Sequence, residues 1–260
     1  MIFFKYEALG NDFIITKESS VGNVEAVKLC DRNFGIGADG VIVHLRSEQY
    51  DAEMKIINSD GSVPEMCGNG FRCFVSYLVT ECGFSSNPLK IMTGRGELTA
   101  YWSKKNSGIE VSANLGKAEW LGTGQVEIGN ILFDLYGISM GNPHIVAVTS
   151  GDISGEMAKK VAEVLQKNNF LGIEVNLEVV QDMDIENRSV SVIVKERGAG
   201  FTLGCGTGGA AVVNAFAQLA KEKTGLWNVS FPGGKVKYEI MDNGETVMTG
   251  IPNKVFKGEI

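Results

Sequence analysis

The hydrophobic pattern after residue 70 predicts an amphipathic helix that follows a glycine-flanked cysteine. The apolar positions recur with helical spacing at Phe71, Phe74, Val75, Leu78, Val79 and Cys82. This spacing places them on one face of a helix, and Gly83 follows where a helix would end. The motif Glu-Met-Cys-Gly-Asn-Gly occupies residues 65–70. Cys67 is therefore predicted at the N-terminus of the helix.

The second half of the chain repeats this arrangement. The motif Gly-Cys-Gly-Thr-Gly-Gly occupies residues 204–209, and Gly225 is a candidate end for the helix that follows. The apolar face of this second helix consists of Val212, Ala215, Phe216, Leu219 and Ala220. In both halves the order is strands, a glycine loop with a cysteine, a helix, and more strands. The pattern indicates an α+β protein with an internal duplication.

Other periodic segments predict two more helices, at residues 23–33 and 154–168, with strands between. The first helix would place Val24, Val27 and Leu29 on its apolar side. Short apolar or alternating runs predict strands near 2–6, 13–16, 41–43, 52–58, 89–93, 97–102, 108–114, 126–136, 145–148, 173–181, 189–195, 227–231, 235–240 and 246–251. Gly122-Thr123-Gly124 is the predicted domain junction, which gives domains 1–120 and 121–250. Residues 251–260 are a candidate strand that returns to the first domain.

Composition narrows the class of protein. The 260 residues are 44% hydrophobic and 21% charged, as in ordinary globular proteins. A net charge of −7 without a Lys/Arg cluster argues against a nucleic-acid partner. No apolar run approaches the roughly 20 residues of a membrane helix, and residues 1–15 do not resemble a secretory signal. Five cysteines, an odd number, do not form a disulfide framework, so we expect a cytoplasmic location.

The two glycine loops can support thiol chemistry. A free thiol has a pKa of about 8.5, and a helix N-terminus can lower it enough to populate the thiolate. The unpaired N–H groups at that end also bind anions such as carboxylates. Flanking glycines let a ligand approach the backbone closely. Cys67 and Cys205 are therefore candidates for two bases, each beside part of an anion site.

Structural explanations compete with this one for every cysteine. Cys30, Cys73 and Cys82 fit the role of small buried apolar residues. For Cys67 and Cys205 the functional reading is favoured, because glycine loops expose a residue and neither extends an apolar stripe. Zinc is not expected, since the cysteines lack Cys-x-x-Cys spacing and the chain has two histidines. The absence of that spacing also argues against a redox pair, and no glycine cluster matches a phosphate loop or a Rossmann fingerprint.

Seven motifs in order resemble the diaminopimelate epimerase family. They are Leu9–Phe13, Phe34–Gly40, Asn58–Ser62, Met66–Gly70 with Arg72-Cys73-Phe74, Met140–His144, Glu196–Gly200 and Cys205–Gly208. The resemblance implies a racemase or epimerase without a cofactor, built from two pseudo-symmetric domains, each with a central helix wrapped by a mostly antiparallel sheet. One cysteine removes the substrate α-proton as thiolate, and the other reprotonates as thiol. These roles fall on Cys67 and Cys205, with His144 as partner of Cys67 and Glu196 as partner of Cys205.

The resemblance also implies a small-molecule amino-acid substrate. Positions that match the family's carboxylate-binding groups are Gly68, Asn69, Gly206 and Thr207, and those that match contacts to the rest of the substrate are Asn11, Asn58, Asn142, Asn176 and Arg197. Arg197 suits a distal carboxylate because a guanidinium binds it in bidentate fashion. A homodimer is a further expectation. For any one asparagine taken alone, and for His144 taken alone, a turn or structural role remains an alternative.

The sequence departs from the family pattern at several positions. Phe201-Thr202-Leu203-Gly204-Cys205 stands where Glu-Thr-Leu-Ala-Cys is usual, and Lys195 stands where an aromatic residue is common. Glu7-Ala8 replaces His-Gly, and Phe71 replaces alanine. None of these removes a candidate catalytic residue. Because Phe201 and Lys195 flank the segment for distal binding, a racemase of another amino acid, such as histidine, stays open. A non-enzymatic binding or thiol-redox protein is a third hypothesis.

Overall fold

The chain forms two compact units in the computed structural model, which describes residues 1–168, 171–221 and 224–260. Unit 1 consists of Met1–Asn114 together with Thr249–Ile260, and unit 2 of Leu115–Met248. The junction predicted at 122–124 lies inside strand β8 (Glu119–Ile128) of unit 2, where Gly122 pairs with Gly137. A register shift between Trp120 and Gly122 interrupts the ladder there. The glycines thus accompany a strand irregularity and not a linker.

Unit 1 is a mixed sheet that wraps a helix. Its strands are β1 (Ile2–Ala8), β2 (Asn11–Thr16), β3 (Gly40–Leu45), β4 (Ala52–Asn58), β5 (Leu89–Thr93), β6 (Gly96–Lys105), β7 (Gly108–Lys117) and β17 (Asn253–Glu259). The pairing order is β17-β1-β2-β3-β4-β5-β6-β7. Only β2–β3 and β4–β5 among these pairs are parallel. The helices α1 (Asn23–Cys30) and α2 (Gly68–Glu81) provide these two parallel crossovers.

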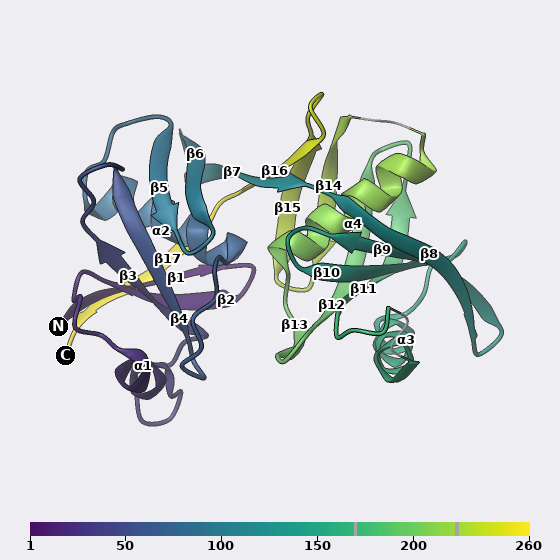
Figure 1. Cartoon of the computed structure of the whole chain (residues 1–260), viewed down its shortest axis with the longest axis horizontal. Helices are drawn as coiled ribbons and strands as arrows, with labels where there is room; N and C mark the ends of the chain where they lie inside the picture. Colours follow the sequence, from purple (N-terminus) through teal and green to yellow (C-terminus); the bar gives the residue numbers. More distant parts are fainter. Residues whose placement is uncertain (169–170, 222–223) are drawn as a thin grey trace. The chain divides into compact units, whose positions relative to one another are not determined.

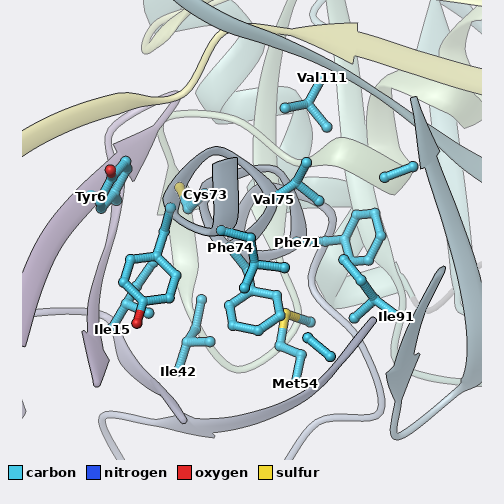
Figure 2. Packing of buried hydrophobic residues seen from close by; sticks show 14 of the residues in the cluster. Tyr6, Ile15, Ile42, Met54, Phe71, Cys73, Phe74, Val75, Ile91 and Val111 are labelled. Atoms are coloured by element: carbon cyan, nitrogen blue, oxygen red, sulfur yellow. The ribbon is translucent and has the colours of Figure 1, made fainter. Parts of the chain in front are cut away.

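The sheet of unit 1 is covered on both faces, which explains its continuous apolar runs. Ile42 packs with α2, whereas its neighbours Val41 and Val43 pack with α1. This alternation follows from the two-residue period of a strand. Figure 2 shows α2 among side chains of the sheet: Tyr6, Ile15, Ile42, Met54, Ile91 and Val111 surround Phe71, Cys73, Phe74 and Val75 of the helix. Burial of both faces fixes the position of α2 and hence of its first turn.

Unit 2 repeats this topology. Besides β8, its strands are β9 (Ile131–Ser139), β10 (Pro143–Val148), β11 (Asn176–Asp184), β12 (Ser189–Glu196), β13 (Gly200–Thr202), β14 (Gly225–Phe231), β15 (Gly234–Ile240) and most of β16 (Glu245–Gly250). The order β9-β10-β11-β12-β14-β15 has parallel pairs at β10–β11 and β12–β14. Helices α3 (Gly155–Asn168) and α4 (Gly206–Leu219) lie in the corresponding crossovers. The mixed α/β fold and the internal duplication predicted from the sequence are confirmed.

The two faces of the unit 2 sheet serve different helices. Ile145 and Ala147 of β10, with Leu177 and Val179 of β11, pack against α3. The alternate residues, His144 on β10 and Asn176 and Glu178 on β11, therefore point to the other face. Helix α4 contacts both of these strands. Polar residues of β10 and β11 are thus directed toward the helix that begins after Cys205.

The structure corrects three local predictions. Helix α1 ends at Cys30 and not at residue 33, because the chain leaves the helical conformation at Asp31. Val24 is 73% exposed, and the buried residues of α1 are Ala26, Leu29 and Cys30. Gly225 begins β14 and does not end α4, whose C-cap is Ala220. Gly83, by contrast, does follow α2 in a left-handed conformation, with φ of 73°.

The return of β17 to unit 1 closes one edge of its sheet. Strand β17, drawn in yellow, runs antiparallel to the purple β1, and the two chain ends lie together (Figure 1). The amino group of Met1 donates a hydrogen bond to the carbonyl of Ile260. Within the described residues, no helix is both long and apolar enough to span a membrane.

Candidate active site

Cys67 caps the N-terminus of α2 with its sulfur. The backbone N–H of Gly70 donates to Sγ over 3.5 Å, and Sγ in turn donates to Oδ1 of Asn11 at 3.6 Å. Asn11 is held by a hydrogen bond of 2.9 Å from its Nδ2 to Asp39. The thiol is partly exposed, as a glycine loop predicts. Of the residues predicted for the site, Asn11, Gly68 and Asn69 are thus brought to Cys67 in unit 1.

A buried arginine lies just inside the same helix. Arg72 is 1% exposed, and its Nη2 donates to Oδ1 of Asn69 over 2.6 Å. The guanidinium is always charged, so it places a positive charge near the first turn of α2. Sequence reasoning missed its part in the site. The available signal was a charged residue inside an otherwise apolar helix, five positions after Cys67.

Asp12 organises the loop that carries Asn11. Its carboxylate pairs with Lys5 at 2.7 Å and with Arg32 at 2.8 Å. Burial by itself raises the pKa of Asp12, but the hydrogen bonds from Arg32 and Lys5 outweigh it and hold the pKa at about 2. Asp39 also binds Arg32, at 2.8 Å. Asn11 is therefore anchored in an ionic cluster and not on a free loop.

Asn58 is placed differently from Asn11. It ends β4, as predicted, but its Nδ2 donates to Oγ of Ser62 over 2.9 Å within its own turn. The backbone N–H of Asn58 donates to the carbonyl of Ser62 as well. These contacts match the alternative in which this asparagine shapes a turn. Its role with a substrate remains a prediction.

Cys205 caps α4 as Cys67 caps α2. The N–H of Gly208 donates to Sγ over 3.4 Å, and Oγ1 of Thr207 lies 3.4 Å from the sulfur. The residue is only 6% exposed, so the expectation that its glycine loop exposes it is wrong. Polar groups of β11 and β12 surround it. Burial, followed by the negative charges of Glu196 and Glu178, raises the pKa of the Cys205 thiol well above its usual value.

Glu196 lies beside Cys205, at the end of β12. Its Oε1 accepts a hydrogen bond of 2.6 Å from Thr202 on β13, and the Cys205 thiol also bonds to it. Burial raises the pKa of Glu196, which the hydrogen bonds from Thr202 and Cys205 partly offset. The side-by-side position of Glu196 and Cys205 agrees with the pairing implied by the family resemblance.

His144 is fully buried in a polar chain that also contains Glu178 and Asn142. Its Nδ1 lies 2.9 Å from Oε1 of Glu178, and its Nε2 lies 3.2 Å from Oδ1 of Asn142. The imidazole and the carboxylate both have no exposed side-chain surface. Sequence reasoning missed Glu178. The signal was a charged residue inside the apolar run 175–180, two positions after Asn176 and hence on the same face.

Asn176 and Arg197 form a second contact in unit 2. Oδ1 of Asn176 accepts the backbone N–H of Arg197 over 2.8 Å, which fixes the turn after β12. The Arg197 side chain is exposed and lines a cavity of about 220 Å³, with Ile173 and Glu174 at its wall. The guanidinium is therefore accessible to a small anion. The cavity is too small for a large ligand.

The two helix starts differ in charge. The first turns of α2 contain the buried Arg72 cation, whereas the first turn of α4 lies near the carboxylates of Glu196 and Glu178. A positive charge favours a thiolate, and carboxylates favour a thiol. The surroundings of Cys205 therefore favour its thiol form.

Known proteins resemble this chain in sequence and in fold. A family model described as diaminopimelate epimerase matches residues 3–121 and 136–255. A diaminopimelate epimerase from Prochlorococcus marinus strain NATL2A is 36% identical over 283 aligned positions, covering 99% of this chain and 98% of the relative. One from Desulfitobacterium hafniense strain DCB-2 is 34% identical, with 99% and 97% covered.

Solved structures of low sequence identity share the fold. A hydroxyproline epimerase from Agrobacterium vitis superposes with a TM-score of 0.72 at 13% identity, covering 100% of this chain and 90% of that one. A predicted epimerase from Pseudomonas aeruginosa gives 0.74 at 12% identity, with 100% and 98% covered. These structures confirm the fold, and the family model and the relatives cover nearly the whole chain. The protein is a member of the diaminopimelate epimerase family.

Proposed function

We propose that the protein epimerises LL- and meso-diaminopimelate, with Cys67 and Cys205 as the two bases. One observation carries this proposal. Each cysteine caps a helix of 14 residues, and each sulfur accepts the N–H of the residue three positions on, at 3.5 Å and 3.4 Å. Two equivalent thiols in duplicated units suit a reaction that removes a proton from one face of a carbon and returns one to the other.

In this mechanism the thiolate of one cysteine takes the α-proton, and the electron pair of the broken C–H bond stays on the substrate. The thiol of the other cysteine then donates its proton to the opposite face and becomes the thiolate. The high pKa of Cys205 favours a resting enzyme in which Cys205 is the thiol that donates the proton. A positioned acid or base contributes about 10²–10⁴-fold to the rate.

The remaining stabilisation of the carbanion would come from groups at its carboxylate. The N–H groups of Gly68, Asn69, Gly206 and Thr207 belong to the first turns of α2 and α4. Such N–H groups bind anions, and preorganised donors favour the negative charge that develops in the transition state. Arg197 would bind the distal carboxylate. The partnership of His144 with Cys67 and the substrate contacts of Asn58, Asn142 and Asn176 also belong to this proposal.

A second candidate is a racemase of another amino acid, motivated by Phe201 and Lys195. These two residues are paired across β12 and β13, and Nζ of Lys195 lies 5.0 Å from the centre of the Phe201 ring. Lys159 approaches the same ring at 5.7 Å. The two departures from the family pattern therefore contact each other. Because their mutual contact explains both departures, they do not by themselves indicate another substrate. Diaminopimelate therefore stays the first choice.

The test is exchange of the α-proton in D₂O, followed by NMR. We expect exchange and epimerisation of LL- and meso-diaminopimelate, with little or none for histidine, proline or lysine. Cys67→Ser and Cys205→Ser should abolish epimerisation, whereas Cys82→Ser, at the half-buried C-cap of α2, serves as the control. Exchange of another amino acid in place of diaminopimelate would favour the second candidate. Full activity in both serine variants would exclude the two-thiol mechanism.

The location, the oligomeric state and the cofactor requirement of the enzyme belong to the same proposal. A cytoplasmic location is supported by five cysteines that are all free. The homodimer predicted from the sequence is also part of the proposal, and sedimentation equilibrium of the purified protein tests it. The proposed reaction needs no cofactor, so added pyridoxal phosphate should leave the rate unchanged.

A further inference from the structure

Glu178 is a fully buried carboxylate that the two-base mechanism does not use. It lies in the middle of β11 with no exposed side-chain surface. A buried charge is costly unless a partner compensates it. Its Oε1 has such a partner in Nδ1 of His144, at 2.9 Å. Among the described protein atoms, its Oε2 has no hydrogen-bond partner. A carboxylate kept in this environment calls for a reason beyond packing.

The carboxylate also lies against the first turn of α4. A Cβ atom built on Gly208 would lie 2.3 Å from Oε1 of Glu178 and 3.1 Å from Cβ of Cys205. Only glycine at 208 leaves room for this approach. Gly208 is the same residue whose N–H donates to the Cys205 sulfur. Glu178 is thereby placed between the buried imidazole and the turn that holds the thiol.

The groups around Cys205 can be named element by element. Glu178 comes from β11 and Glu196 from β12, while Thr207 and the N–H of Gly208 come from α4 itself. Behind the two carboxylates, His144 of β10 contacts Glu178, and Thr202 of β13 donates to Glu196. Tyr238 of β15 donates to the carbonyl of Gly206 in the first turn of α4. A helix N-terminus favours a thiolate. Two carboxylates oppose that effect here.

We propose that Glu178 is a positioning residue, which orients His144 through Nδ1 and keeps Cys205 in its thiol form between turnovers. This role rests on the proposed two-base function, because only a proton-donating cysteine requires it. Both ring nitrogens of His144 face oxygen atoms, of Glu178 and Asn142. The contact at Nδ1 fixes the orientation of the ring, and Glu196 remains the carboxylate in direct contact with the sulfur.

The first test is the pH dependence of Cys205 alkylation by iodoacetamide, read by mass spectrometry of the Cys205 peptide. Glu178→Gln keeps the shape of the side chain and removes its charge. We expect the midpoint of alkylation to move about one pH unit or more toward lower pH. The control is Asp182→Asn, an exposed carboxylate on the same strand, which should leave the midpoint unchanged. If folded Glu178→Gln is alkylated with the same midpoint as the parent protein, the proposal is overturned.

A second readout separates positioning from simple packing. The chain has two histidines, so the ring ¹⁵N spectrum of labelled protein contains two sets of signals, assigned with a His44→Asn variant. Because the oxygen that faces Nδ1 of His144 then belongs to an amide and not to a carboxylate, Glu178→Gln should shift the His144 ring ¹⁵N signals. An unchanged His144 spectrum overturns the orienting role. Neither this spectrum nor the alkylation midpoint involves a substrate, so both stay informative if diaminopimelate proves to be the wrong one.

Kinetics complete the design. In a diaminopimelate-active enzyme, Glu178→Gln should lower kcat about 10- to 100-fold and change KM less than threefold, because the substrate contacts remain. If Glu178→Gln does not fold, Glu178→Asp takes its place, since it keeps the charge but withdraws it by one methylene from Gly208. It should show a smaller downward shift of the alkylation midpoint. No shift in Glu178→Asp would then contradict the proposal.

Discussion

Oδ1 of Asn11 lies 3.6 Å from the sulfur of Cys67, although 56 residues separate the two along the chain. The other end of the same amide is bonded to Asp39, so its orientation is fixed. Asn11 is therefore placed to accept a hydrogen bond from the Cys67 thiol and to hold the sulfur toward one side of the first turn of α2. This relationship leads to the first prediction.

Asn11→Ala should lower kcat/KM about 10-fold, because it removes one hydrogen bond worth roughly 1 kcal/mol at the sulfur. The measurement is the rate of α-proton exchange at low substrate concentration. Asn33→Ala, in the exposed turn after α1, is the matched control and should keep the parent rate. Equal rates for Asn11→Ala and the parent would show that the sulfur does not depend on this contact.

Asp12→Asn should destabilise unit 1, since Lys5 is buried and loses its partner. Removing one member of a buried ion pair costs about 3–5 kcal/mol of unfolding free energy. Because Asp12 is partly exposed, we expect a loss of about 3 kcal/mol or less for Asp12→Asn. The pKa of Asp12 is about 2 in the folded protein, against about 3.9 in the unfolded chain. The contribution of the Asp12 ion pairs to the unfolding free energy is therefore complete above about pH 4 and is lost as the pH falls toward about 2.

Urea unfolding of Asp12→Asn and the parent protein at pH 7 and below pH 4 checks this. The difference in unfolding free energy should be largest at neutral pH and shrink as the pH decreases from about 4 toward 2. Asp242→Asn, an exposed carboxylate in a turn, is the control. A difference that grows on acidification would contradict the assigned ion pairs.

Gly209→Ala should destabilise unit 2. A Cβ at this position would lie 2.3 Å from the hydroxyl oxygen of Tyr238, and that side chain is fully buried. Overpacking of this kind costs about 1–3 kcal/mol. Gly151→Ala, where no atom lies within 4 Å of the added carbon, should change stability by less than about 0.5 kcal/mol. Thermal unfolding compares the two, and equal losses would mean that Tyr238 yields without cost.

Arg197→Ala should reduce kcat/KM for LL-diaminopimelate by about 10- to 100-fold through a higher KM, because charged hydrogen bonds contribute roughly 1.5–3 kcal/mol. Arg197→Lys should recover little, since an ammonium cannot form the bidentate contact. Steady-state kinetics at saturating and limiting substrate distinguish KM from kcat. Arg46→Ala, an exposed arginine of unit 1, provides the control. An unchanged KM in Arg197→Ala would remove Arg197 from the substrate site.

Elements with a strong local pattern were predictable. The period of 3.6 residues after Cys67 placed α2, and alternation placed β4 at 52–58, as found. The positions of Asn11, Asn58, Asn142 and Asn176 at strand ends or turns followed from the same pattern. Such signals are local because each depends on residues within one element.

Features that depend on distant partners were not predictable. Cys205 is buried beside carboxylates of β11 and β12, although a glycine loop surrounds it in the sequence. The partnership of Glu178 with His144 joins residues on two neighbouring parallel strands, and a lone acidic residue in an apolar run does not name its partner. At α1, the apolar period suggested Val24 and Val27 for the core, but the sheet covers Ala26 and Leu29 instead. Register against a sheet decides which side of a weakly patterned helix is buried.

The pairing of β17 with β1 has a consequence for biosynthesis. Unit 2 is one continuous segment, whereas unit 1 needs a strand that is translated after all of unit 2. Domains generally fold as units during synthesis, in order from the N-terminus. Here that order is reversed in part: unit 2 can complete its sheet while the edge strand β1 still lacks its neighbour. Unit 1, which carries Cys67, should therefore be the last part of the chain to mature on the ribosome.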